Sequence, residues 1–150
     1  MGTRSLTTFL DEKGELVCRM YINGDGFPWV FGVTLAEHVL HYNDPEWERS
    51  LALVVGEFVQ DAPDRTLLIG NDIGWGEDYR YIIQRPWSKN VGPQITVEYP
   101  TLDHKKVVIS TSCEDFVLRI RKFDENESWK DYEDNQEALE HIFRDLIKVV

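Results

Sequence analysis

Alternation of apolar and polar residues over residues 16–22 is the sequence feature that most constrains the fold. Apolar side chains recur there at every second position, at Leu16, Cys18, Met20 and Ile22. This is the period of a strand with one buried face. A strand at about residues 4–10 precedes it, and Gly14 suits the left-handed position that closes the turn between them. The sequence therefore predicts an N-terminal β-hairpin.

Four later segments have the same character. β-Branched residues and tyrosines alternate there between breaks rich in turn residues, over 66–70, 79–85, 94–99 and 105–111. With the hairpin, they predict a largely antiparallel sheet of about five to six strands.

Two helices are expected after the hairpin. Thr34 and Glu37 have the spacing of a capping box, so a short helix is predicted to begin at Thr34 and to end at about Tyr42. Asp44 and Pro45 offer a cap and a first-turn proline for the second helix, which Pro63 ends. Its apolar residues recur at helical spacing, at Trp47, Leu51, Val54, Val55 and Phe58.

The C-terminal part has two further helical patterns. Ser112 and Asp115 resemble a helix cap, followed by a short helix with Phe116, Ile120 and Phe123 inside; a strand is the alternative. The last helix is predicted from apolar residues at Leu139, Ile142, Phe143, Leu146, Ile147 and Val150. Helices beside an antiparallel sheet make the predicted fold class α+β, in a single domain over residues 1–150.

Composition limits the kind of protein. A chain of 150 residues with 42% hydrophobic residues can bury a core of its own. No long apolar run predicts a membrane span or an export signal, so we expect a cytoplasmic protein. Cys18 and Cys113 have no disulfide framework or zinc spacing, which is typical of a reducing compartment.

Charge is unevenly distributed. The net charge is −11, and residues 124–150 hold nine acidic and three basic residues. This balance opposes direct nucleic-acid or anionic-membrane binding and favours a basic partner. The acidic C-terminal segment is either a solvated helix face, with Glu133, Glu137 and Glu140 outside, or a binding face that mimics DNA phosphates.

The stretch YINGDGFPWVFG, residues 21–32, combines glycines and aromatic residues. Asp25-Gly26 is predicted to form a tight turn with a positive φ, for which Gly26 is the candidate residue. Either at least two of the rings of Phe27, Trp29 and Phe31 fold back over the sheet as part of the core, or one or two of them stay exposed as binding residues. Both hold at once if Phe27 and Phe31 pack over the sheet. Because neighbouring side chains of an extended segment point to opposite sides, Trp29 is then expected to face outward as a binding residue, since tryptophan is enriched in interface hot spots.

Candidate chemistry is sparse. His38 and His41 lie three residues apart without a third ligand, and they are interpreted as a surface pair. Cys113 has acidic neighbours that oppose a thiolate, and its only candidate base is His104. The carboxylates of Asp72, Glu77 and Asp78, in GNDIGWGEDY, are interpreted as part of an exposed turn that also holds Trp75. No catalytic residue, cofactor or metal is predicted.

The N-terminal segment also carries a family resemblance. MGTRSLT at the start is followed by Tyr21, then Asp25-Gly26-Phe27-Pro28, then Gly32 and Leu35-Ala36-Glu37. This pattern resembles a family of small, mostly uncharacterised phage and prophage proteins that read Y-R-Q-x-D-G-Y-P-S-G-H-G before a leucine-rich helix. Here Ile22-Asn23 replaces Arg-Gln, and Trp29-Val30-Phe31 replaces Ser-Gly-His. The resemblance covers about forty residues and implies a phage or mobile-element origin.

Together these features predict a non-enzymatic, phage-type interaction protein of the host cytoplasm that modulates or inhibits a host or defence protein. Its partner-binding residues are expected to be Tyr21, Asp25, Phe27, Trp29, Trp75, Glu133, Glu137 and Glu140. Two alternatives stay open. One is a small enzyme or ligand-binding protein with a pocket between sheet and helices, and the other is a homo-oligomeric structural component.

Overall fold

The computed structural model describes residues 3–22, 24–42, 51–60, 65–68, 78–84, 92–101, 103–132 and 134–150. The predicted hairpin is present, formed by β1 (Ser5–Leu10) and β2 (Leu16–Ile22). Gly14 has φ +78°, as predicted. The Asp11 carboxylate accepts hydrogen bonds from the backbone N–H groups of Lys13 and Glu15, each at 2.9 Å. These bonds hold the turn.

The other strands complete one mixed sheet. They are β3 (Arg65–Leu68), β4 (Tyr79–Gln84), β5 (Gln94–Pro100), β6 (Lys106–Ser112) and the short β7 (Lys148–Val149). The strand order is β3-β2-β1-β4-β5-β6-β7. Only β1 and β4 are parallel among these pairs, and the rest are antiparallel. The prediction of a largely antiparallel α+β sheet is therefore confirmed.

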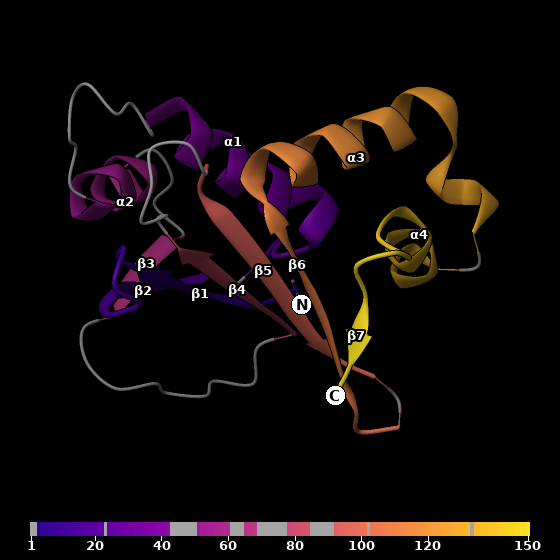
Figure 1. Cartoon of the computed structure of the whole chain (residues 1–150), viewed down its shortest axis with the longest axis horizontal. Helices are drawn as coiled ribbons and strands as arrows, with labels where there is room; N and C mark the ends of the chain where they lie inside the picture. Colours follow the sequence, from indigo (N-terminus) through magenta and orange to yellow (C-terminus); the bar gives the residue numbers. More distant parts are fainter. Residues whose placement is uncertain are drawn as a thin grey trace.

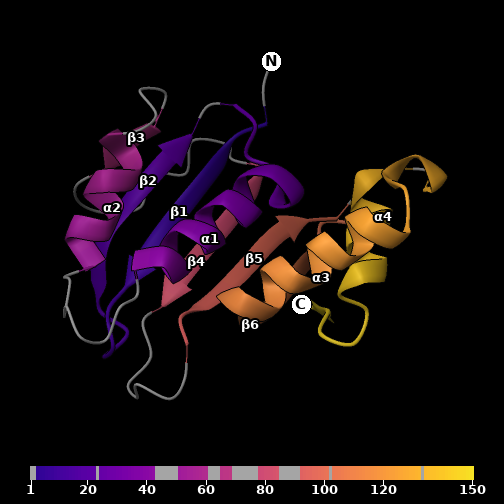
Figure 2. The same ribbon diagram turned by 90° about the horizontal axis from the view of Figure 1, so that it is seen from above.

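Helices cover one face of the sheet (Figures 1 and 2). They are α1 (Val33–Tyr42), α2 (Leu51–Gln60), α3 (Cys113–Asn126) and α4 (Asn135–Ile142), with short turns of helix at η1 (Pro28–Gly32) and η2 (Trp129–Asp131). The core lies between the two layers, where Tyr81, Ile83, Ile95, Val97 and Ile109 are fully buried beneath α1 and α3.

The start of α1 differs from the prediction. Thr34 is not a helix cap, because its hydroxyl donates to the Val30 carbonyl (3.0 Å) from inside a continuous helical path. That path begins at Phe27, whose carbonyl accepts from the N–H groups of Val30, Phe31 and Gly32. Pro28 occupies its first turn, where a residue without an N–H loses no hydrogen bond. In the sequence, Pro28 was therefore the residue that indicated where the helical path begins.

Two predictions concerning helices α2 and α3 have different outcomes. In α3 the Ser112 hydroxyl accepts from the Asp115 N–H (3.0 Å), and Phe116, Ile120 and Phe123 are buried. The helix is confirmed over the strand alternative. In α2, Val55 and Phe58 are buried as expected. The predicted cap at Asp44-Pro45, the side chains of Trp47, Leu51 and Val54, and the stop at Pro63 lie outside the described residues.

The predicted C-terminal helix is too long. α4 ends at Ile142, and Phe143 leaves the helical conformation with φ −111° and ψ 23°. The chain then pairs with β6, where Lys106 and Val150 exchange backbone hydrogen bonds of 3.0 and 2.8 Å. Edge strand β6 offers these groups, and β-branched Val149 and Val150 suit a strand. Tertiary pairing therefore replaces the last helical turns.

Candidate protein-interaction surface

The loop before η1 is fixed by contacts with the start of the sheet. Gly26 donates its N–H to the Thr3 carbonyl (2.9 Å), and the buried Tyr81 hydroxyl donates to the Gly26 carbonyl (2.6 Å). The positive φ predicted for the Asp25-Gly26 turn is present, but it belongs to the exposed Asp25 (+55°) and not to Gly26. Gly26 is required for space instead, because a Cβ there would lie 2.8 Å from the Ser5 Cβ.

Trp29 lies in a group of rings. Its centroid is 4.8 Å from that of Phe27, with the rings stacked, and 6.4 Å from that of Tyr79. Phe31 is buried beside Tyr81, as expected. Trp29 is half-buried, so the expectation that it faces outward is wrong. The segment is helical, and the alternation of an extended chain does not apply; the exposed residue is Val30 (49%).

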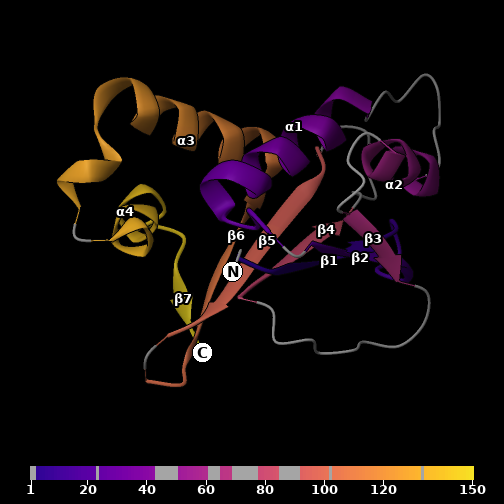
Figure 3. The ribbon, with the colours of Figure 1, turned by 180° about the vertical axis from the view of Figure 1, so that it is seen from behind.

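The ring group continues into the C-terminal part of the chain. The ring centroid of Trp129, in η2, lies 5.4 Å from that of Trp29 and 4.7 Å from that of Phe123. Phe123 in turn contacts Tyr132 at 5.6 Å. Figures 2 and 3 show that one end of the purple helical ribbon of α1 is directed toward α4. We call Phe27, Trp29, Tyr79, Phe123, Trp129 and Tyr132 the aromatic band.

Helix α4 is joined to the band and to the sheet by two tyrosines. Gln136 Nε2 donates to the hydroxyl oxygen of Tyr79 (3.1 Å), and the Tyr99 hydroxyl donates weakly to the Glu140 carboxylate (3.5 Å). Burial, together with the Glu140 charge, raises the pKa of Tyr99. Ala138 and Leu139 face the core. This leaves Glu137 and Glu140 exposed beside the aromatic band, as predicted.

Two residues of the aromatic band, Trp129 and Tyr132, donate hydrogen bonds to carboxylates, and further acidic residues lie nearby in the C-terminal segment. Exposed acidic residues here are Asp124, Glu127, Asp131, Asp134, Glu137 and Glu140. Asp124 accepts from the Trp129 indole N–H (2.6 Å), and Glu127 accepts from the Tyr132 hydroxyl (3.1 Å). Within the described residues, no lysine or arginine forms an ion pair with Asp124, Asp131, Asp134 or Glu140. Negative charge therefore persists around the band.

An open hollow of about 420 Å³ lies at the α4 end of this surface. It is lined by Tyr132, Glu137, Glu140, His141, Arg144 and Ile147. The Arg144 guanidinium contacts His141 Nδ1 (3.0 Å), and His141 Nε2 lies 3.5 Å from Glu127. Of the residues predicted as separate binding elements, Phe27 and Trp29 are thus linked to Glu137 and Glu140 through Trp129 and Tyr132.

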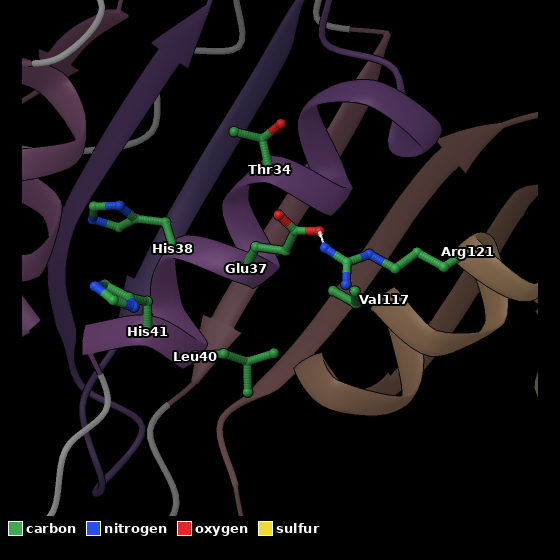
Figure 4. Close-up of a pocket in the computed structure, with 7 residues that line it drawn as sticks. All are labelled: Thr34, Glu37, His38, Leu40, His41, Val117 and Arg121. Carbon is green, nitrogen blue, oxygen red and sulfur yellow. Dashed lines mark hydrogen bonds and ion pairs between the residues drawn. The ribbon is translucent and has the colours of Figure 1, made fainter.

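A second hollow, of about 650 Å³, lies between α1 and α3 (Figure 4). The Glu37 carboxylate, predicted to cap α1, instead pairs with Arg121 of α3. His38 and His41 lie together on the other side of α1 in Figure 4, and the His38 ring packs against Phe58 at 4.7 Å. The Glu37–Arg121 pair neutralises the main charges of this hollow, which makes it the weaker candidate site.

The remaining predicted site residues are scattered or not described. Tyr21 is half-buried on β2, opposite Leu6 in the register. Its side chain points to the sheet face away from buried Met20 and Ile22, and so away from the aromatic band. Trp75 and Glu133 lie outside the described residues. Sequence reasoning missed Tyr79, Trp129, Tyr132 and Gln136; the aromatics among acidic residues in ESWKDYED were the available cue.

Burial opposes ionisation of the Cys18 and Cys113 thiols. Burial raises the pKa of Cys113 to about 12 and that of Cys18 to about 11. In the described part of the chain, no three His, Cys, Asp or Glu side chains gather in a way that fits a metal ion. Ser5 and Thr7 are the buried polar residues found there, and both lie in the sheet rather than in a hollow.

Comparison with models of known protein families, with characterised protein sequences and with solved structures gave no match. None of the helices in the described ranges has both the length and the apolar character needed to span a bilayer.

Proposed function

We propose that this chain is a non-enzymatic, phage-type interaction protein that binds a host or defence protein through the aromatic band and its surrounding carboxylates. The 5.4 Å contact between Trp29 and Trp129 carries the proposal, because it unites the opening loop and the acidic C-terminal segment. Half-buried tryptophans and tyrosines with acidic neighbours are typical of interfaces that combine a few energetic residues with charge complementarity.

The phage or mobile-element origin and the cytoplasmic location are part of this proposal. They are supported by the resemblance of residues 1–37 to phage and prophage proteins. A protein that acts by occluding another surface needs a rigid scaffold and a binding face, and both can be supplied by a sheet covered with helices.

The proposal is tested by affinity capture from a bacterial lysate with three forms of the protein. We expect one host protein to be retained by the wild type and by Val30→Ala, and lost with Trp29→Ala. Val30 is the matched control because it is exposed on the same turn, outside the aromatic band. A protein retained equally by all three forms would contradict this binding surface.

The enzyme or ligand-binding alternative depends on the hollow between α1 and α3, whose polar lining includes Thr34, His38 and His41. A small molecule that protects the wild type against heating, but not Arg121→Ala, would support it. The homo-oligomer alternative is tested by measuring the mass in solution.

A further inference from the structure

The two tryptophans of the aromatic band share their surface with the carboxylates of Asp124, Asp131, Asp134 and Glu140, which form no ion pair with a lysine or arginine among the described residues. We infer that this surface receives a basic segment of the partner protein, with an arginine of that segment stacked on the indole rings of Trp29 and Trp129. The inference rests on the proposed function and specifies the chemistry of its partner.

Arginine fits the rings and the carboxylates at once. A guanidinium is planar and weakly hydrated, so it stacks on indole and still donates sideways to a carboxylate. The Asp124 carboxylate accepts from the Trp129 indole N–H (2.6 Å), which places an acceptor at the ring edge. A lysine ammonium lacks this planar, forked geometry. We therefore expect arginine to be preferred over lysine.

The molecule contains such an arrangement at its own surface, between α3 and the segment after α4. The Arg119 guanidinium lies 5.8 Å from the centre of the Phe143 ring and donates to both oxygens of Asp145, at 2.6 and 3.0 Å. There an arginine combines ring contact with a bidentate carboxylate. The aromatic band and Asp124 offer the same two features to an arginine from outside.

Charge complementarity selects the class of partner. Residues 124–150 hold nine acidic and three basic residues, and Arg144 is engaged with His141. Such a field repels nucleic acid and attracts a basic protein segment. A basic segment is therefore the occupant we propose.

Tyr79 is a positioning residue for this surface. Its ring contacts Trp29 at 6.4 Å, and its hydroxyl accepts from Gln136 of α4 at 3.1 Å. Tyr79 is 3% exposed, so it touches the partner little or not at all. It joins α4, the helix that carries Glu137 and Glu140, to the ring of Trp29.

The test uses a short peptide that alternates arginine and alanine, with lysine and citrulline peptides of equal length for comparison. Affinity is measured by calorimetry, and the indole N–H signals of Trp29 and Trp129 are followed by NMR. We expect the arginine peptide to shift both signals, the lysine peptide to bind about 3-fold more weakly, and the citrulline peptide to bind at least about 10-fold more weakly. Equal binding of arginine and lysine peptides, without indole shifts, would overturn the inference.

Substitutions test whether the peptide binds at the aromatic band or is attracted only by the net negative charge of the protein. Trp29→Ala and Trp129→Ala, each verified as folded by circular dichroism, should weaken the arginine peptide about 10-fold, and Val30→Ala should leave it unchanged. Glu137→Gln with Glu140→Gln should weaken it several-fold, roughly 3- to 10-fold. Glu12→Gln with Glu114→Gln is the matched control, because it removes the same charge from exposed positions elsewhere. If the two double variants weakened peptide binding equally, the inference would be overturned.

Tyr79→Phe keeps the ring and removes the hydrogen bond with Gln136. We expect about 3-fold weaker peptide binding and a flatter salt dependence at an unchanged melting temperature, with no additional loss on adding Gln136→Leu. Unchanged binding would remove the positioning role. If the peptide binds as expected but no host protein depends on Trp29, the proposed function fails. If such a host protein is found but the peptide does not bind, only the arginine inference fails.

Discussion

The indole rings of Trp29 and Trp129 are in contact, with centroids 5.4 Å apart and planes tilted by 42°. Trp29 belongs to the turn before α1, whereas Trp129 belongs to the turn between α3 and α4. Their contact makes the opening loop part of the same surface as the acidic C-terminal segment. It also gives Trp29 a share in stability, which an outward-facing side chain would lack.

Replacing Trp29 by alanine should therefore lower stability as well as partner binding. A fully buried tryptophan costs about 3–5 kcal/mol on truncation, and this one is half-buried, so we expect about 2 kcal/mol. For a domain of this size that corresponds to a fall of roughly 4–8 °C in melting temperature. Thermal unfolding checks it against Val30→Ala, for which we expect a fall of about 1 °C or less. Equal melting temperatures would show that the ring contacts do not stabilise the fold.

Gly26→Ala should be destabilising for steric reasons. The new Cβ would lie 2.8 Å from the Ser5 Cβ and 3.0 Å from the Thr3 carbonyl oxygen, so β1 or the loop must shift, at about 1–3 kcal/mol. Adding Ser5→Gly should recover part of the loss by removing the closer atom. Gly24→Ala is the control, since among the described residues no heavy atom other than those of Gly24 and its chain neighbours lies within 4 Å of the added Cβ. Similar melting temperatures for the two alanine variants would contradict the steric explanation.

Arg119→Ala should loosen the C-terminal segment. Arg119 donates to Asp115, Asp145 and the Ile142 carbonyl, so one side chain joins α3 to the end of α4. With its side chain only 27% exposed, we expect a loss of about 1–2 kcal/mol, measured by urea unfolding. Arg121→Ala removes a 60% exposed cation and should cost less than about 1 kcal/mol. A larger loss of stability in Arg121→Ala than in Arg119→Ala would contradict the structural role given to Arg119.

The ion pair between Arg119 and Asp145 also predicts how stability changes at low pH. Hydrogen bonding from Arg119 lowers the pKa of Asp145 below its ordinary value of 3.8. As the pH falls, the unfolded chain takes up this proton first, so the pair's contribution to stability begins to fall near the ordinary pKa and is lost below the native one. The decline of stability on acidification should therefore be shallower in Arg119→Ala. Parallel pH profiles would show that the pair contributes nothing measurable.

Cys113 should resist thiol reagents in the native protein. Burial raises its pKa from 9.0 to about 12, so at pH 9 to 10 the native thiol stays protonated while the unfolded thiol ionises. Stability should consequently decline between pH 9 and 12, and Cys113→Ala should reduce that decline. Mass spectrometry after iodoacetamide treatment tests the reactivity, with urea-unfolded protein as the control. Rapid native labelling of Cys113 would contradict its burial.

Local patterns predicted those elements whose hydrogen bonds are local. Gly14 has the left-handed conformation expected from the hairpin turn, and Ser112 caps α3 at the Asp115 N–H. Alternation over residues 16–22 predicted β2 because a strand with one buried face needs that period. In each case neighbouring residues supply the determining contact, so the sequence is sufficient.

Contacts between residues far apart in the chain decided those parts of the structure that the sequence did not predict. The apolar spacing through Val150 is helical, but β6 offers Val150 a hydrogen-bonded partner at Lys106, and the chain becomes a strand. The parallel pairing of β1 with β4 and the contact of Trp29 with Trp129 likewise join residues far apart in the chain. The sequence alone determined the N-terminal hairpin, the Ser112 cap of α3 and an acidic C-terminal segment. Only the tertiary structure decided which of them meet, because burial and strand pairing depend on partners that local spacing does not specify.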